Sequence, residues 1–157
     1  MTRFIKQSRL AASPAAVFRF HESPTALTAL IPPWEHLRVA ETSGSLQSGS
    51  RVVLKGRLFA IIPVTWVALH TEYDPPHLFA DRQVSGPFSS WYHRHRFLDD
   101  GAGGTILRDE VDYSAPLGAL GQFFGGWLIT RQLERMFTYR HETTKRLVES
   151  GASEPPR

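Results

Sequence analysis

The 157-residue chain contains no cysteine, so it can form neither a disulfide nor a metal site with thiolate ligands. A chain without disulfides suits a reducing compartment. Long apolar runs are also missing, and the first ten residues, MTRFIKQSRL, alternate polar and apolar types instead of resembling a signal peptide or a membrane span. We therefore expect a cytoplasmic protein with no stable membrane insertion.

Concentrated positive charge and nucleotide-binding motifs are absent as well. The net charge is +3, but the arginines are scattered, which favours ordinary surface charge over a nucleic-acid partner. The chain has no nucleophile motif and no dinucleotide fingerprint, and the segment GALGQFFGG is too irregular for a phosphate-binding loop. The oligomeric state stays open, a homodimer included.

The alternation of apolar and polar residues predicts an antiparallel sheet. Ser13 followed by Pro14 is typical of a helix start, and a second short helix is expected around residues 25–30, before Pro32 and Pro33. Turn-forming segments separate the expected strands at hairpin spacing. These strands are residues 2–10, 36–42, 50–59, 64–73, 78–85, 91–98 and 105–113.

From residue 117 onward the apolar period changes to that of one long helix, whose stripe includes Ile129, Leu133, Met136 and Arg140. The order of elements predicts an α+β class, with a curved antiparallel sheet of about seven strands wrapped around this C-terminal helix. We expect one domain over residues 1–150 and a disordered polar tail over 151–157.

The strand WYHRHRF carries the most informative pattern. Side chains alternate between the faces of a strand, so Trp91, His93 and His95 share the apolar face. The DDGAGG hairpin pairs this strand with residues 105–113, which places Asp109 directly across from His93 or His95. Alternation on the preceding strand turns Asp81 inward.

Gln83 shares that alternation, and Arg140 joins the set from the helix stripe. Unpaired buried charges are costly, so these ionisable groups must form a hydrogen-bonded network. The network could pin the helix to the sheet, or it could orient the polar end of an apolar ligand. The two interpretations are compatible.

A metal is weighed separately. His93 and His95 with a nearby carboxylate could form a zinc or iron site. No further metal-coordinating residue can be assigned from the sequence, because His70 is predicted to point to the opposite face if Phe79 points inward. We therefore predict no metal and no other cofactor.

Three aromatic residues, Phe123, Phe124 and Trp127, lie among glycines at the start of the long helix. They are candidates either for the mouth of a ligand cavity or for ordinary core packing. Glycines at 121, 125 and 126 would loosen this helical segment.

A series of short motifs is spread over nearly the whole chain. They are Phe20-His21, Pro32-Pro33, Trp66, His70, residues 73–76, residues 79–83, GPF, WYHRHRF, Gly104-Thr105 and residues 109–113. Together these motifs resemble the SRPBCC superfamily, also called START-like or helix-grip. Within it the chain is most similar to the bacterial ligand-binding SRPBCC group, also labelled cell-division-inhibitor-like, which includes domains fused to nucleotide-sugar-epimerase-like proteins.

The resemblance implies a cavity between the sheet and the C-terminal helix, which relatives use for sterols, lipids, plant hormones, polyketides or quinones. A minority of relatives are aromatases or cyclases. We expect binding of a small, largely hydrophobic molecule. The alternatives are a cyclase or dehydratase using the His/Asp group, in which an imidazole serves as acid or base, and a protein-interaction module with a filled core.

Overall fold

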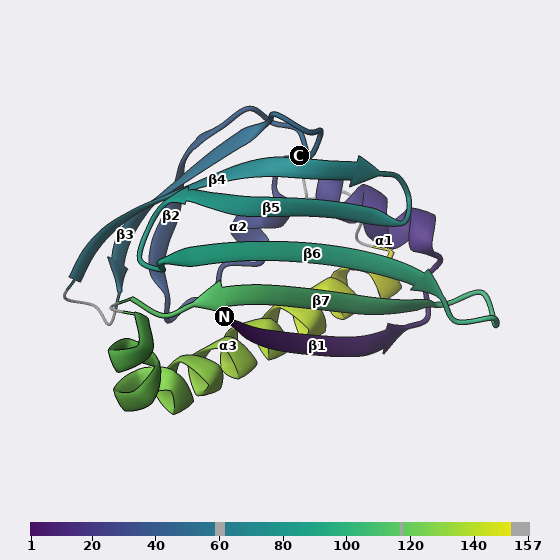
Figure 1. The fold of residues 1–157 in the computed structure, drawn as a ribbon. Coiled ribbons are helices and arrows are strands. Elements are labelled where there is room, and N and C mark those ends of the chain that lie inside the picture. The colour runs from purple at the N-terminus through teal and green to yellow at the C-terminus, as the bar shows by residue number, and fades with distance from the viewer. Residues whose placement is uncertain (59–61, 117, 152–157) are drawn as a thin grey trace.

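The computed structural model describes residues 1–58, 62–116 and 118–151, with the side chains of 58 and 118–124 outside that description. Within these residues the chain forms a seven-stranded antiparallel sheet and three helices, shown in Figure 1. The elements are β1 (Thr2–Leu10), α1 (Pro14–Glu22), α2 (Ala26–Ala29), β2 (His36–Thr42), β3 (Arg51–Leu58), β4 (Ile62–Asp74), β5 (Leu78–Ser85), β6 (Ser90–Asp99), β7 (Thr105–Ser114) and α3 (Gly118–Glu149).

The strands follow the order β1-β7-β6-β5-β4-β3-β2, so the first strand pairs with the last one and the others form a meander. Figure 1 shows the sheet curving over α3, with α1 and α2 on the same side of the sheet. The predicted α+β class and the sheet wrapped around a C-terminal helix are confirmed. Within the described residues, no helix is both long enough and apolar enough to cross a membrane.

Local chemistry fixes the start of α1 as predicted. The Ser13 hydroxyl accepts a hydrogen bond from the Ala16 backbone N–H at 3.3 Å, and Pro14 occupies the first helical position. Such a cap satisfies a backbone donor that the helix itself cannot pair. The strand predicted at 50–59 corresponds to β3, Arg51–Leu58, and Phe59 lies outside the described residues. Most of the expected tail, from residue 152 on, lies outside them too.

The turn between β6 and β7 sets the register of the most polar part of the sheet. Asp100 Oδ1 accepts backbone hydrogen bonds from Ala102 and Gly104, both at 2.8 Å. Gly101 and Gly103 have φ values of 76° and 85°, a region that glycine enters without steric cost. The pairing that follows places His95 opposite Asp109, one of the two predicted registers.

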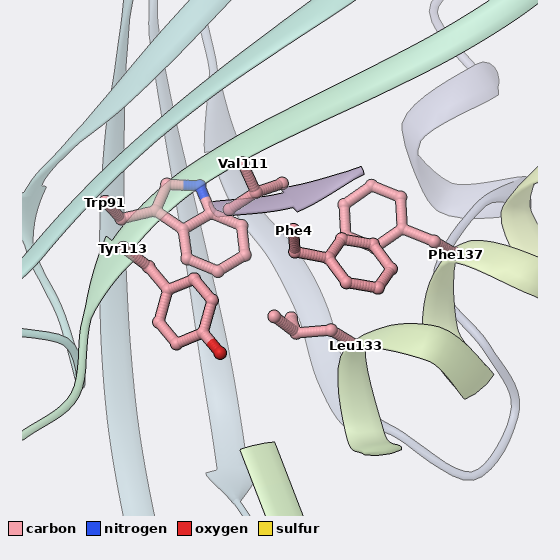
Figure 2. Packing of buried hydrophobic residues seen from close by; sticks show 6 residues of the cluster. All are labelled: Phe4, Trp91, Val111, Tyr113, Leu133 and Phe137. Carbon is pink, nitrogen blue, oxygen red and sulfur yellow. The ribbon is translucent and has the colours of Figure 1, made fainter. Parts of the chain in front are cut away.

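Two apolar clusters pack the helices against the sheet. One joins α3 to the sheet, and Figure 2 shows Leu133 and Phe137 facing the side chains of the strands. The other packs α1 on the sheet through Phe18, Phe79 and Phe97. The first cluster consists of Phe4, Trp91, Val111, Tyr113, Leu133 and Phe137.

The histidines of β6 lie where these clusters meet. His93 packs edge-on against Phe137 of the first cluster, with ring centroids 5.1 Å apart. His95 stacks on Phe79 of the second cluster at 4.0 Å. Both histidines are buried, so the apolar clusters hold the rings in place from either side.

Candidate functional site

A cavity of about 230 Å³ lies between the sheet and the helices. Its wall is mostly apolar on β2, β3 and β4, through residues such as Val39, Leu54 and Trp66. Its ionisable groups come mainly from β5, β6, β7 and α3. Of the residues predicted for the site, those that line the cavity are Asp81, Trp91, His93, His95, Asp109, Met136 and Arg140.

Asp109 is the centre of the polar group. Because a carboxylate can only accept hydrogen bonds, the Nε2–H groups of His93 and His141 donate to it, at 3.2 and 2.8 Å. Burial alone would raise the pKa of Asp109, but the charge of His95 and these hydrogen bonds hold its pKa well below its usual range. Asp109 is therefore ionised although it is only 3% exposed.

His141 ties this group to the edge of the sheet. Its Nδ1 lies 2.8 Å from the hydroxyl of Ser8 on β1. In the neutral ring whose Nε2–H donates to Asp109, Nδ1 accepts a hydrogen bond from the hydroxyl of Ser8. This chain of hydrogen bonds joins β1, α3 and β7, and it fixes the orientation of the Asp109 carboxylate.

Asp81 completes the group from β5, where it pairs with His93 across the sheet. Its Oδ2 lies 3.7 Å from His93 Nδ1 and 3.7 Å from His95 Nε2. These separations are too long for hydrogen bonds. Burial would raise the pKa of Asp81, but its interaction with His95 and the charge of His93 lower the pKa below its ordinary value.

The two histidines of β6 differ in their protonation. Burial alone would lower the pKa of His95, but the negative charges of Asp109 and then Asp81 outweigh this effect and raise the pKa above 6.5. Burial and the charge of His95 outweigh the effect of the carboxylates on His93, and the pKa of His93 is lowered. Such neighbours titrate as a coupled pair, and the first proton that the pair takes up resides on His95 and not on His93.

The contact between His95 and Asp109 is close but poorly aligned. Nδ1 of His95 lies 2.8 Å from Asp109 Oδ1. The nitrogen nevertheless has no hydrogen-bond partner of acceptable geometry and is buried. The attraction between the two is thus mainly that of opposite charges, and a small rotation of either side chain would complete the hydrogen bond.

Arg140 on α3 and His21 on α1 line the cavity from two helices. The Nε–H of Arg140 donates to the Leu30 carbonyl at 3.3 Å, and burial lowers the pKa of its guanidinium against the opposing pull of Asp109. The Nδ1–H of His21 donates to the Val17 carbonyl at 2.8 Å. Burial lowers the pKa of His21 to about 3, so this ring is neutral.

The sequence did not identify three cavity histidines. The prediction that His70 points away is wrong, because a bulge in the pairing of β4 with β5 places it opposite Asp81, and it lines the cavity. An extra residue in a bulge shifts the alternation of faces. His21 and His141 follow the buried residues Val17 and Phe137 by four positions, and this helical spacing could have indicated both.

The remaining predicted residues do not line the cavity or have side chains outside the part of the chain that the structure describes. The carboxamide of Gln83 is engaged by the Phe88 backbone, donating to the carbonyl at 2.7 Å and accepting from the N–H at 3.3 Å. Trp127 is 67% exposed on α3 and is not among the cavity-lining residues. The side chains of Phe123 and Phe124 lie outside the described residues.

Solved structures share this architecture over nearly their whole length. Protein TTHA0849 from Thermus thermophilus is 15% identical, with a TM-score of 0.74 over 96% of this chain and 99% of that chain. The Zhui aromatase/cyclase from Streptomyces sp. R1128 is 17% identical, with a TM-score of 0.73 over 94% and 93%. A norcoclaurine synthase point mutant from Thalictrum flavum, in complex with a transition-state analogue, is 14% identical, with a TM-score of 0.72 over 96% of each chain.

At these identities the likeness shows the fold alone, and the fold is the helix-grip type of SRPBCC and Bet v1-like proteins. A family model described as "Domain of unknown function (DUF8410)" matches residues 8–148. The chain therefore belongs to this family. Comparison with curated proteins gives no match.

Proposed function

We propose that the protein binds a small, largely hydrophobic molecule in the cavity, with its polar end at the His/Asp/Arg group. The observation that carries this proposal is the division of the cavity wall: mostly apolar residues on β2, β3 and β4, and most of the ionisable ones on β5, β6, β7 and α3. Ligand pockets commonly combine a broad apolar lining with a few convergent polar groups. The finer assignment to the bacterial ligand-binding SRPBCC group, and a cytoplasmic location, belong to the same proposal.

Size and charge narrow the class of ligand. A volume of about 230 Å³ is slightly below the range of about 300–1,000 Å³ common for ligand pockets, which favours a compact molecule such as an aromatic polyketide or a quinone over a whole sterol. Within the His/Asp/Arg group, the charges of Asp81 and Asp109 are opposed by Arg140 and by His95 when it is protonated. A neutral polar group, such as a carbonyl or a phenol hydroxyl, therefore suits the site better than a strong anion or cation.

A substitution that fills the cavity provides the test. Ala68 lines the cavity on β4, whereas Thr65 on the same strand is exposed, so Ala68→Phe and Thr65→Phe form a matched pair. Native mass spectrometry of the purified protein should detect a co-purifying small molecule in the wild type and in Thr65→Phe, and lose it in Ala68→Phe. A hydrophobic fluorescent dye should bind the wild type and Thr65→Phe with similar affinity and Ala68→Phe more weakly.

Two results would contradict binding in the cavity: equal retention of the molecule and dye by both variants, or no bound molecule and no dye binding in the wild type. The melting temperature of each variant should be recorded as well, because extra volume in a packed interior can itself destabilise a protein by about 1–3 kcal/mol.

A cyclase or dehydratase activity is the second candidate, and the state of His93 favours it. A neutral imidazole oriented by an ionised carboxylate is the usual form of a general base, and the Nε2–H of His93 donates to Asp109. One of the structural neighbours is named an aromatase/cyclase. Multiple-turnover conversion of a poly-β-ketone substrate, abolished by His93→Gln but not by Thr65→Phe, would establish this candidate. A module with a filled core is disfavoured, because a cavity of about 230 Å³ remains between the sheet and the helices.

A further inference from the structure

We propose that Asp81, His93 and His95 form a binding site for a divalent first-row transition metal such as Zn²⁺. The pairing of β5 with β6 sets Asp81 opposite His93, and His95 follows two residues later on the same face. One ligand atom from each residue lies within 4.8 Å of the others. The inference goes beyond the proposed function, because metal binding requires no organic ligand.

The separations suit coordination better than hydrogen bonding. Asp81 Oδ2 lies 3.7 Å from His93 Nδ1 and 3.7 Å from His95 Nε2. Metal–ligand bonds of about 2.1 Å at the tetrahedral angle put ligand atoms about 3.4 Å apart. A small rotation of the side chains, without backbone movement, would bring the three atoms to this spacing.

Asp109 presents the correct ring nitrogens to the metal. The Nε2–H of His93 donates to it, and Nδ1 of His95 lies 2.8 Å from the same carboxylate oxygen. The opposite nitrogen of each ring, Nδ1 of His93 and Nε2 of His95, therefore faces Asp81. Each offers a lone pair when its ring is neutral, so the metal must displace the second proton of His95. A carboxylate behind a metal-bound histidine fixes the tautomer and the ring orientation, and His141 holds Asp109 in turn.

The type of ligand indicates which metals suit the site. Imidazole nitrogens prefer zinc, iron, nickel and copper, whereas Mg²⁺ and Ca²⁺ prefer sites made of oxygen atoms alone. Three protein ligands leave at least one coordination position open, which is typical of catalytic rather than structural zinc. All three residues line the cavity, so the open position faces the space proposed for the ligand.

Metal titration tests the site directly. Protein freed of any polyhistidine tag and treated with a chelator is titrated with ZnCl₂ and, separately, with MgCl₂ by isothermal calorimetry at about pH 7.5, since protons compete for the histidines. We expect one Zn²⁺ per chain and no Mg²⁺ binding. Asp81→Asn and His93→Gln should each weaken Zn²⁺ binding at least tenfold, while His36→Gln, at an exposed position of β2, should leave it unchanged.

Absence of Zn²⁺ binding by the wild type, or equal affinity in the folded variants, would overturn the proposal. Circular dichroism checks that the variants fold. If they do not, ¹⁵N NMR of the histidine rings in the wild type decides: Zn²⁺ should shift Nδ1 of His93 and Nε2 of His95. Shifts confined to other histidines would reject the site, and the Ala68→Phe test of ligand binding would stand regardless of this outcome.

Discussion

Replacing Asp109 with asparagine should destabilise the protein more than any other isosteric change on β7. The substitution keeps the shape of the side chain but removes the charge that attracts Arg140 and raises the pKa of His95. It also places an amide N–H where a carboxylate accepts hydrogen bonds from two rings. His141 can adapt, because its other nitrogen faces the Ser8 hydroxyl, so the largest loss is at His93 and in the charge balance.

The expected cost is about 1.5–3 kcal/mol, the range for losing a hydrogen bond to a charged group in a buried site. For a chain of 157 residues, each kcal/mol shifts the melting temperature by about 2–4 °C, so the midpoint should fall by about 3–12 °C. Urea unfolding gives the free energy, and EDTA in all samples keeps the protein free of metal. NMR titration should show that the pKa of His95 falls, because Asp109 is the main group that raises it.

Asp112→Asn is the matched control, since Asp112 lies on the same strand and faces away from the cavity. Its carboxylate pairs with the exposed Arg3 through contacts of 2.7 and 2.8 Å, and surface ion pairs contribute at most about 1 kcal/mol. Equal losses in the two variants, or an unchanged pKa of His95 in Asp109→Asn, would refute the view that Asp109 organises the network.

Four further substitutions test the packing, the backbone and the pH dependence. Phe137→Ala empties a fully buried site between α3 and the sheet and should cost about 3–5 kcal/mol in urea unfolding; a loss below about 1 kcal/mol would mean that this cluster is not tightly packed. Gly56→Ala would put a Cβ atom 1.8 Å from the His36 carbonyl oxygen and should lower the melting temperature. Gly125→Ala on α3 meets nothing within 4 Å and should raise stability by up to about 1 kcal/mol. A Gly56→Ala variant more stable than Gly125→Ala would contradict the described backbone. The pKa of His21 is lowered to about 3 in the folded protein, so between about pH 6.5 and 3 only the unfolded chain binds a proton at this residue. Acidification over this range should therefore lower the free energy of unfolding by about 1.4 kcal/mol for each pH unit. If the free energy of unfolding depends on pH just as steeply in His21→Gln, other groups cause the dependence.

The course of the strands was predictable because one face of the sheet is buried. Along β6 and β7 the burial alternates residue by residue, and a period of two in the sequence therefore identifies which side chains point inward. Alternation cannot tell how far one strand slides along its neighbour, which is why two partners for Asp109 remained open. The hydrogen bonds of the turn at Asp100 decide between them.

The cavity was less predictable than the sheet, for three physical reasons. The bulge that turns His70 inward depends on the pairing of β4 with β5, which leaves no local signal in the sequence. Buried polar residues on helices, such as His141, look like surface residues until their partner on another element is known. Trp127 is the converse case: its apolar side chain favoured a buried place, but α3 exposes it.

The pairing of β1 with β7 has a consequence for synthesis on the ribosome. Arg3 and Asp112, which meet across these strands, are 109 residues apart in the chain. At a translation rate of about 5–20 residues per second, β1 waits roughly 5–20 s for its partner strand to be made. During that time its alternating apolar side chains and unpaired backbone groups are open to other nascent chains. Chaperone demand should therefore be greatest before β7 emerges, and slow codons in residues 11–104 would prolong that exposure.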